Sequence, residues 1–172
     1  MKQANHRLSA IKNFFYLFII LLLIWLALTS SLQWQELAIG LLVSLLLAAF
    51  LSHSYQRLGL PAISLKRLFY FLIYLVVLFA EIIRANLDVA YRVVHPKMPI
   101  KPGIVVIRTE LKQDLAKLLL ANSITLTPGT FTLDILGDRL LIHWINVKSE
   151  DTEQATRMIG ERFEKYLRVI FA

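Results

Sequence analysis

Four charged side chains inside a long apolar stretch are the residues best placed to do chemistry. They recur at steps of three or four and therefore share one helical face: Glu81, Arg84, Asp88 and Arg92. Ionisable groups that enter a bilayer are costly and often mark an ion or proton route. The same spacing also builds a ladder of ion pairs at a helix end that lies among lipid headgroups. We favour the ladder, because several charges cluster in one half of the segment.

A second candidate region, residues 118–135, carries hydroxyl side chains around a turn. We expect a helical run to end near Asn122 and extended chain to follow on both sides of Pro128-Gly129, a pair that suits the centre of a type II turn. The run lacks the Gly-Lys-[Ser/Thr] ending of a phosphate-binding P-loop, so its threonines are interpreted as strand and turn residues. The candidate turn or interface residues are Ser123, Thr125, Thr127, Pro128, Gly129, Thr130 and His143.

Other catalytic or metal-binding arrangements find little support. The four histidines are far apart and have no second ligand at metal spacing, and there is no cysteine. His143 is expected in a strand, on the opposite face from Ile142 and Trp144. No set of nucleophile, base and orienting group can be assembled from neighbouring positions. We therefore expect no catalytic residues, no metal and no cofactor.

Composition indicates a membrane protein with a small polar domain. Of the 172 residues 57% are hydrophobic, and the mean hydropathy is +0.60. Residues 1–96 hold eight Lys/Arg and three Asp/Glu, whereas residues 97–172 hold eleven and nine. The positive excess therefore lies beside the apolar segments, where it sets membrane orientation, and no nucleic-acid partner is expected.

The predicted membrane region, residues 1–95, contains apolar segments at about 14–32, 34–52 and 68–94. A signal peptide is the alternative for the first segment. Basic residues near the N-terminus and around Gly59-Leu60-Pro61 predict a hairpin whose two ends are cytoplasmic. Small residues of the second segment share a face that packs either within this hairpin or against a partner: Gly40, Ser44, Ala48 and Ala49.

The third segment allows two topologies. If it crosses the bilayer, the C-terminal domain is external. This placement conflicts with the positive-inside rule, because the segment is followed by the basic residues Arg92, Lys97 and Lys101. If it lies in the interface or dips in without crossing, that domain is cytoplasmic. We favour the second topology, because the charges lie directly beside the segment.

The remainder is a Pro-rich linker, residues 96–103, followed by a small α+β domain, residues 104–172. Its expected order is β-α-β-β-α, with helices on one face of the sheet. The ranges are strand 104–108, helix 112–121, strands 130–136 and 140–147, and a last helix opened by a cap from Asp151 to Gln154. Gly137-Asp138 suits a two-residue hairpin loop of type II′.

The string SITLTPGT at residues 123–130 carries a resemblance to a known family. With Lys101-Pro102-Gly103-Ile104 before it and Ile142-His143-Trp144 after it, the chain resembles the E subunit of the Mrp-type multisubunit cation/proton antiporters, also called Mnh or Sha. The resemblance covers nearly the whole chain. It implies a bacterial cytoplasmic membrane, a cytoplasmic C-terminal domain, and the other antiporter subunits and the bilayer as partners.

What the resemblance implies is a non-catalytic subunit that supports assembly and stability of a Na⁺/H⁺ antiporter. In that family the ion routes are attributed mainly to large subunits, and this chain lacks their series of intramembrane Lys and Glu. Two alternatives stay open: a membrane-anchored ligand-binding or enzymatic module that uses SITLTPGT, and a monomeric sensor of lipid or potential.

Overall fold

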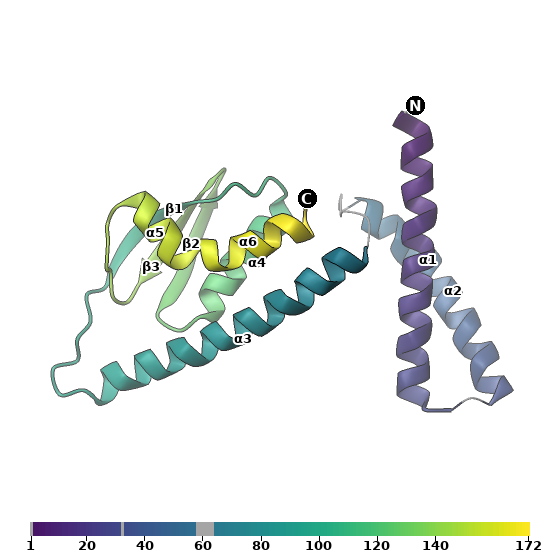
Figure 1. The fold of residues 1–172 in the computed structure, drawn as a ribbon, viewed down its shortest axis with the longest axis horizontal. Coiled ribbons are helices and arrows are strands. Elements are labelled where there is room, and N and C mark those ends of the chain that lie inside the picture. Colours follow the sequence, from purple (N-terminus) through teal and green to yellow (C-terminus); the bar gives the residue numbers. More distant parts are fainter. Residues whose placement is uncertain (1, 32, 58–63) are drawn as a thin grey trace. The chain divides into compact units, whose positions relative to one another are not determined.

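The computed structural model describes residues 2–31, 33–57 and 64–172 (Figure 1). The chain divides into two compact units, Met1–Ser64 and Leu65–Ala172, and each is described by itself. The Gly59-Leu60-Pro61 break between the second and third apolar segments lies outside the described residues.

The first unit is a helical hairpin of α1 (Lys2–Thr29) and α2 (Trp34–Arg57). Gly40, Ser44 and Ala48 are buried between the two helices, and a Cβ on Gly40 would lie 2.4 Å from the Trp25 ring. The Trp25 indole donates a hydrogen bond of 3.1 Å to the carbonyl of Glu36. Three of the four small residues therefore pack within their own hairpin, the first of the two alternatives given above, whereas Ala49 is exposed.

Two helices are long and apolar enough to cross a membrane within the described part of the chain, over Trp34–Ser52 and Leu65–Val94. The apolar part of α1, Asn13–Thr29, is slightly shorter. A spanning helix needs about 20 residues, with a range of roughly 17–25, so α1 and α2 together make a plausible membrane hairpin.

The second unit combines one long helix with a small α+β fold. Its elements are α3 (Leu65–Val94), β1 (Gly103–Arg108), α4 (Asp114–Leu126), β2 (Thr130–Leu136), β3 (Arg139–Trp144), α5 (Thr152–Ile159) and α6 (Glu161–Ile170). The three strands are antiparallel in the order β1-β3-β2. The β-α-β-β-α prediction is confirmed, except that two helices replace the last one.

The core lies between one face of the sheet and the helices. Alternate residues of β1 and β3 point inward, where they meet the buried faces of α4, α5 and α6. The residues of this core with almost no exposed surface include Ile107, Leu120, Ile124, Leu140, Ile142, Phe163 and Leu167. Helices cover one face of the sheet, as the sequence predicted.

The prediction that the chain becomes extended after Asn122 is wrong, because α4 continues to Leu126. The hydroxyl of Ser123 donates to the carbonyl of Leu119 at 2.6 Å, and that of Thr127 donates to the carbonyl of Ser123 at 2.8 Å. These bonds reach back one helical turn, so the hydroxyls are satisfied within a helix despite the strand-like alternation.

Several boundaries also differ from the prediction, and β1 and β3 each begin one residue early, at Gly103 and Arg139. Helix α4 begins at Asp114 instead of residue 112, and β3 ends at Trp144 instead of residue 147. The last helix breaks at Gly160, where a Cβ would lie 3.3 Å from the Ile107 side chain of β1. The missing Cβ therefore lets the helix pair approach the sheet closely.

Helix α3 belongs to the second unit, whereas the sequence-based division placed it in the membrane region. Tyr74 is buried and Leu78 is partly buried against the core cluster. The Tyr74 hydroxyl makes a buried hydrogen bond of 2.5 Å with Ser123 of α4. The compact unit therefore begins at Leu65 rather than after the Pro-rich linker.

Candidate functional site

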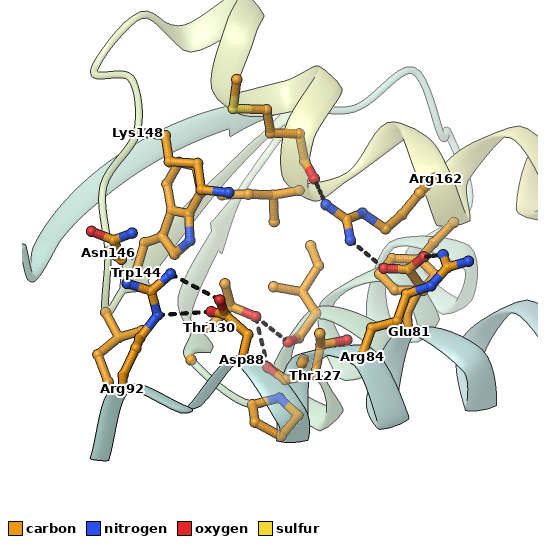
Figure 2. Close-up of a pocket in the computed structure, with 18 residues that line it drawn as sticks. Glu81, Arg84, Asp88, Arg92, Thr127, Thr130, Trp144, Asn146, Lys148 and Arg162 are labelled. Atoms are coloured by element: carbon orange, nitrogen blue, oxygen red, sulfur yellow. Dashed lines mark hydrogen bonds and ion pairs between the residues drawn. The ribbon is translucent and has the colours of Figure 1, made fainter. Parts of the chain in front are cut away.

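A cavity of about 300 Å³ lies between α3 and the α+β fold (Figure 2). We call it the α3 cavity. It is lined by the charged residues of α3, the turn at residues 127–130, the end of β3 and the residues that follow it, and one face of α5 and α6. It therefore joins two of the regions singled out in the sequence.

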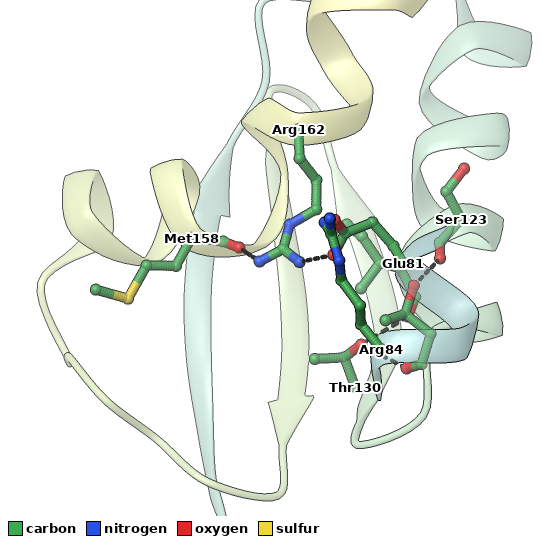
Figure 3. A network of polar contacts seen from close by, with 8 residues as sticks. Glu81, Arg84, Ser123, Thr130, Met158 and Arg162 are labelled. Carbon is green, nitrogen blue, oxygen red and sulfur yellow. Dashed lines mark hydrogen bonds and ion pairs between the residues drawn. The ribbon is translucent and has the colours of Figure 1, made fainter. Parts of the chain in front are cut away.

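One wall of the cavity is centred on Glu81. Its carboxylate accepts a hydrogen bond of 2.7 Å from Arg84 and another from Arg162 of α6. Arg162 also donates to the carbonyl of Met158 (Figure 3). The side chain of Glu81 is only 13% exposed, so this carboxylate is a largely buried bridge between two guanidinium groups.

The opposite wall is a second ion pair near the C-terminal end of α3. Arg92 donates two hydrogen bonds to Asp88, of 2.8 and 2.9 Å, and a third of 2.6 Å to the carbonyl of Pro99. With its amide oxygen turned toward Arg92, Asn146 accepts a further bond of 3.0 Å. Arg92 thus ties α3 to the linker and to the segment after β3.

The floor of the cavity is the Pro128-Gly129 turn. Gly129 has φ +90°, and the backbone N–H of Thr130 donates to the carbonyl of Thr127 at 3.2 Å. This is the geometry of the predicted type II turn. The Thr130 hydroxyl donates to the carbonyls of Ile124 and Thr127. It therefore satisfies carbonyls at the C-terminal end of α4.

The structure places the other candidate residues outside this cavity. Ser123 is buried against Tyr74, and the hydroxyl of Thr125 accepts a bond of 3.2 Å from the backbone of Thr132 on the outer side of α4. His143 is exposed on the face of the sheet that the helices leave open, paired in register with Ile104 and Phe131.

The lining residues that the sequence did not predict for a site include Arg162, Lys148 and Trp144. Arg162 lies on the amphipathic last helix, where an arginine beside aromatic residues needs no special role. A better signal was available, because Arg162 falls three to four residues from Met158, Ile159 and Tyr166 and so interrupts the apolar stripe. An arginine inside an apolar stripe needs a buried partner, and Glu81 is that partner.

Among the described residues there is no group of three His, Cys, Asp or Glu side chains that could hold a metal ion. The two carboxylates of the α3 cavity lie on opposite walls, and each is held by arginine (Figure 2). Chemically, the arrangement is suited to binding and holding charge.

Comparison with known sequences identifies one family. A family model described as Na⁺/H⁺ ion antiporter subunit, MNHE, matches residues 18–170. Among curated proteins, the Na⁺/H⁺ antiporter subunit E1 of Staphylococcus aureus strain JH9 is 34% identical over 88% of this chain and 92% of its own length. The subunit E1 of Staphylococcus epidermidis strain RP62A is 31% identical over 86% and 90%.

Comparison with solved structures identifies a similar chain in an archaeal respiratory membrane complex, the membrane-bound sulfane sulfur reductase. That chain is 51% identical, with a TM-score of 0.75, over 93% of this chain and 99% of its own length.

Proposed function

Because the chain belongs to the MNHE family of Na⁺/H⁺ ion antiporter subunits, we propose that it is a non-catalytic subunit that supports assembly and stability of a cation/proton antiporter complex in the cytoplasmic membrane. Its partners are then the other subunits of the complex and the lipid bilayer. The contacts of α3 with the rest of the chain are the observation that carries this proposal.

The non-catalytic role is supported by how the charges of α3 are used. Glu81 is engaged by two arginines, and Asp88 is engaged by Arg92. A carboxylate on an ion route must exchange partners easily, whereas one bridged by guanidinium groups in a largely buried position is costly to release. These residues fit an ion-pair ladder that fastens α3 to its own fold.

An in-plane position for α3 is supported by the extent of these contacts. They run from Arg67, which donates to the terminal carbonyl of Ala172 at 2.5 Å, to Arg92 at the opposite end. At 1.5 Å per residue they cover about 38 Å of helix, more than the ~30 Å of bilayer hydrocarbon. If α3 crossed the bilayer, the charged α+β fold would lie in lipid, where unpaired ionised groups are very costly.

The opposite face of α3 is apolar apart from the exposed Asn86, whose amide donates to the carbonyl of Ile82 at 2.8 Å. Phe69, Val76, Phe79 and Leu87 are each more than 60% exposed. Large side chains at this spacing, with charges on the other face, are typical of a helix lying in the membrane interface. The positive-inside rule places both ends of the hairpin on the cytoplasmic side. Because an in-plane α3 does not cross the bilayer, the C-terminal domain is then cytoplasmic as well.

The open face of the sheet is the surface we assign to another subunit. Ile104 and Phe131 are 60% and 52% exposed and flank His143 in one cross-strand row. Val106 and Leu141 form the next row of this face. An exposed apolar patch of this kind on a folded domain usually marks a protein contact.

Topology is tested in the cysteine-free chain with an impermeant maleimide applied to intact cells. Glu150→Cys, at an exposed site, is expected to stay unlabelled until the cells are permeabilised. Gln33→Cys, in the exposed turn between α1 and α2, is the matched control and is expected to react from outside. Strong labelling of Glu150→Cys in intact cells would overturn the cytoplasmic placement.

The position of α3 is tested by the depth of spin labels at Phe69→Cys, Val76→Cys and Leu87→Cys. An in-plane helix gives similar, shallow depths at all three sites, measured by collisions with oxygen and with a water-soluble nickel reagent. A spanning helix gives its greatest depth at Val76 and shallow values at the two ends. That second pattern would exclude the in-plane position.

Partner docking is tested by co-purification from membranes in mild detergent with a C-terminal tag. The wild-type chain is expected to bring large antiporter-like proteins and small hydrophobic subunits in fixed ratio. Phe131→Glu is expected to lose them while the chain itself stays folded, and Lys112→Glu is the control on the helical side. Recovery of the wild-type chain alone would contradict the subunit role.

A second candidate function is supported by the 51% identity to a chain of the archaeal sulfane sulfur reductase, well above the 34% identity to the antiporter subunit E1 of S. aureus. The chain would then serve a respiratory membrane complex. Assays of the same co-purified material distinguish the two functions. Reduction of sulfane sulfur supports the respiratory complex. Na⁺/H⁺ exchange in proteoliposomes, with no reduction of sulfane sulfur, supports the antiporter.

A further inference from the structure

The sheet has two outer edges, formed by β1 and β2. In an antiparallel pair, every second residue of an outer strand turns its backbone N–H and C=O away from the partner strand. On β1 the alternation is set where the strand ends. The N–H of Thr109 donates to a carbonyl of the β2–β3 loop at 2.8 Å, whereas the N–H of Arg108 donates to the hydroxyl of Thr156 on the outer side at 3.0 Å. The backbone groups of Ile104 and Val106 therefore also point outward.

The outer edge of β2 is closed by bonds within the chain. The outward N–H of Thr130 donates to the carbonyl of Thr127, and that of Thr132 donates to the hydroxyl of Thr125. A β-bulge between Thr132 and Asp134 interrupts the register of this strand. Features of this kind prevent an edge from pairing with a further strand.

Within the described chain, the outer edge of β1 lacks such a closure at its N-terminal half. Neither Ile104 nor Val106 makes a hydrogen bond on its outer side with another described residue. A groove of about 340 Å³ lies beside them, lined by residues 101–106 and by the segment that leads into α5. We call it the β1 groove. An apolar edge with free backbone groups beside open space is a template for another strand.

Two arginines meet at the C-terminal end of this edge. Arg108 and Arg139 are both exposed and lie opposite one another in the register of β1 and β3. Like charges directly opposite in a sheet are destabilising. Arg108 shares a cavity with carboxylates of α5 and α6, yet neither arginine makes an ion pair with a described residue. A carboxylate on an added strand would relieve this repulsion.

We propose that the β1 groove accepts a short extended segment of another subunit, which pairs with the outward N–H and C=O of Ile104 and Val106 and places an acidic side chain beside Arg108. At about 3.3 Å per residue, the free edge admits a strand of about three to five residues. The proposal rests on the proposed role of the chain as a subunit. It adds a mode of recognition to the open face of the sheet, because the side chains of Ile104 and Val106 belong to that face.

A second copy of this chain fits the groove less well. Lys101 lies at one end of the free edge and Arg108 at the other. Antiparallel pairing of two β1 strands across a two-fold axis would bring Arg108 of one copy near Lys101 of the other. Like charges in neighbouring strands repel, whereas an acidic segment of a different chain would meet opposite charge.

Amide hydrogen exchange at single-residue resolution tests the pairing in the wild-type protein. The complex purified from membranes is compared with the full chain alone in the same detergent. The amides of Ile104 and Val106 are expected to exchange at least about tenfold more slowly in the complex. Those of Val105 and Ile107 point toward β3, so they are the matched control and are expected to be slow in both samples. Fast exchange of Ile104 and Val106 in a complex that retains its subunits would overturn strand addition and leave the subunit role intact.

Val106→Pro removes one outward donor and no bond to β3. Proline is tolerated on an edge strand where its nitrogen faces outward, but it cannot donate to an added strand. Val106→Ala shortens the same side chain and keeps the N–H. The recovery of co-purified subunits is expected to be at least about tenfold lower for Val106→Pro than for Val106→Ala. Thermal unfolding of both variants compares their folds, and equal recovery would contradict the proposal.

Arg108→Glu tests the acidic side chain of the partner. The reversed charge is expected to lower the recovery of subunits about tenfold, whereas Lys112→Glu, at an exposed site outside the groove, is expected to leave it unchanged. Unchanged recovery with Arg108→Glu would overturn the choice of an acidic segment. Slow exchange of Ile104 and Val106 in a dimer of the chain alone would assign the groove to a second copy instead. Recovery of the wild-type chain without any subunit would overturn the subunit role, and this proposal with it.

Discussion

In the α1–α2 hairpin the buried positions of the described residues hold small or polar side chains, whereas in the second unit they also hold many large apolar ones. Gly40, Ser44 and Ala48 are buried in the hairpin, while Leu28 and Phe50 are 79% and 73% exposed. In the second unit Phe163 and Leu167 are buried. Close backbone approach stabilises helices in lipid, where apolar burial gives little driving force between them. The two patterns therefore correspond to two solvents.

Helix α3 combines both patterns. Its Tyr74 face is part of a water-type core, and its Phe79 face is exposed like the outer surface of the hairpin. Under the proposed in-plane position, a helix with both kinds of face would lie at the boundary between the two solvents. The following substitutions test this comparison.

The largest effect is expected for Phe163→Ala in the core of the second unit. Phe163 is 1% exposed, and truncating a buried Phe costs about 3–5 kcal/mol in the free energy of unfolding. Phe79→Ala is the matched control at a 66% exposed site, with an expected change within about 0.5 kcal/mol. Pulse proteolysis in urea measures both. Similar losses for the two variants would break the comparison.

In the hairpin, Gly40→Val is expected to lower the stability more than truncation of a large exposed side chain does. Its Cβ would meet the Trp25 ring, and overpacking costs about 1–3 kcal/mol. Leu46→Ala, at a 62% exposed site, is the control. Unfolding in sodium dodecyl sulfate, followed by tryptophan fluorescence, measures the difference. Greater sensitivity to Leu46→Ala would mean that the hairpin is organised like a water-soluble core.

Gly129→Ala tests the turn on which the α3 cavity rests. Its φ of +90° costs an L-residue about 1–2 kcal/mol, and the added Cβ would lie 2.8 Å from Ile145. Gly137→Ala shares a positive φ but meets open space, so its cost is expected at about 1 kcal/mol, clearly below that of Gly129→Ala. Thermal unfolding of both variants compares them. Equal costs would show that the contact with Ile145 is unimportant.

The smallest effect is expected for Tyr74→Phe, which removes the hydrogen bond between α3 and α4. One buried hydrogen bond contributes about 1 kcal/mol. A double-mutant cycle with Ser123→Ala isolates the pair, and the free energy of unfolding of the second unit is the readout. A coupling near zero would mean that α3 is held by its apolar contacts and its ion pairs alone.

The sequence predicted those parts of the fold that depend on neighbouring residues. The bounds of β2, the Asp151 cap on Gln154 at 2.9 Å and the two-residue loop at Gly137 are all confirmed. Each depends on backbone preferences or bonds within a few residues. The C-terminal turn of α4 was missed because Ser123 and Thr127 donate to carbonyls one turn back in spite of the strand-like alternation, and Ser123 adds a bond with Tyr74 of a distant helix.

The candidate site was predicted only in part. Spacing alone placed Glu81, Arg84, Asp88 and Arg92 on one face, and the structure shows the bonds between neighbouring members. It could not show that this face meets Arg162 and the turn at Gly129, because those residues are far away along the chain. A helix with one charged and one apolar face has the same sequence pattern whether the charged face meets water or protein.

The packing of α3 against later elements also has a consequence for synthesis. Its last residue leaves the ribosome about 70 residues before Phe163, a delay of roughly 4–14 s at about 5–20 residues per second. During that interval α3 is a long apolar helix without its covering fold, and it follows the two apolar helices of the hairpin along the chain. The four charges of its C-terminal half then oppose insertion as a third span, before they take up their contacts in the finished protein.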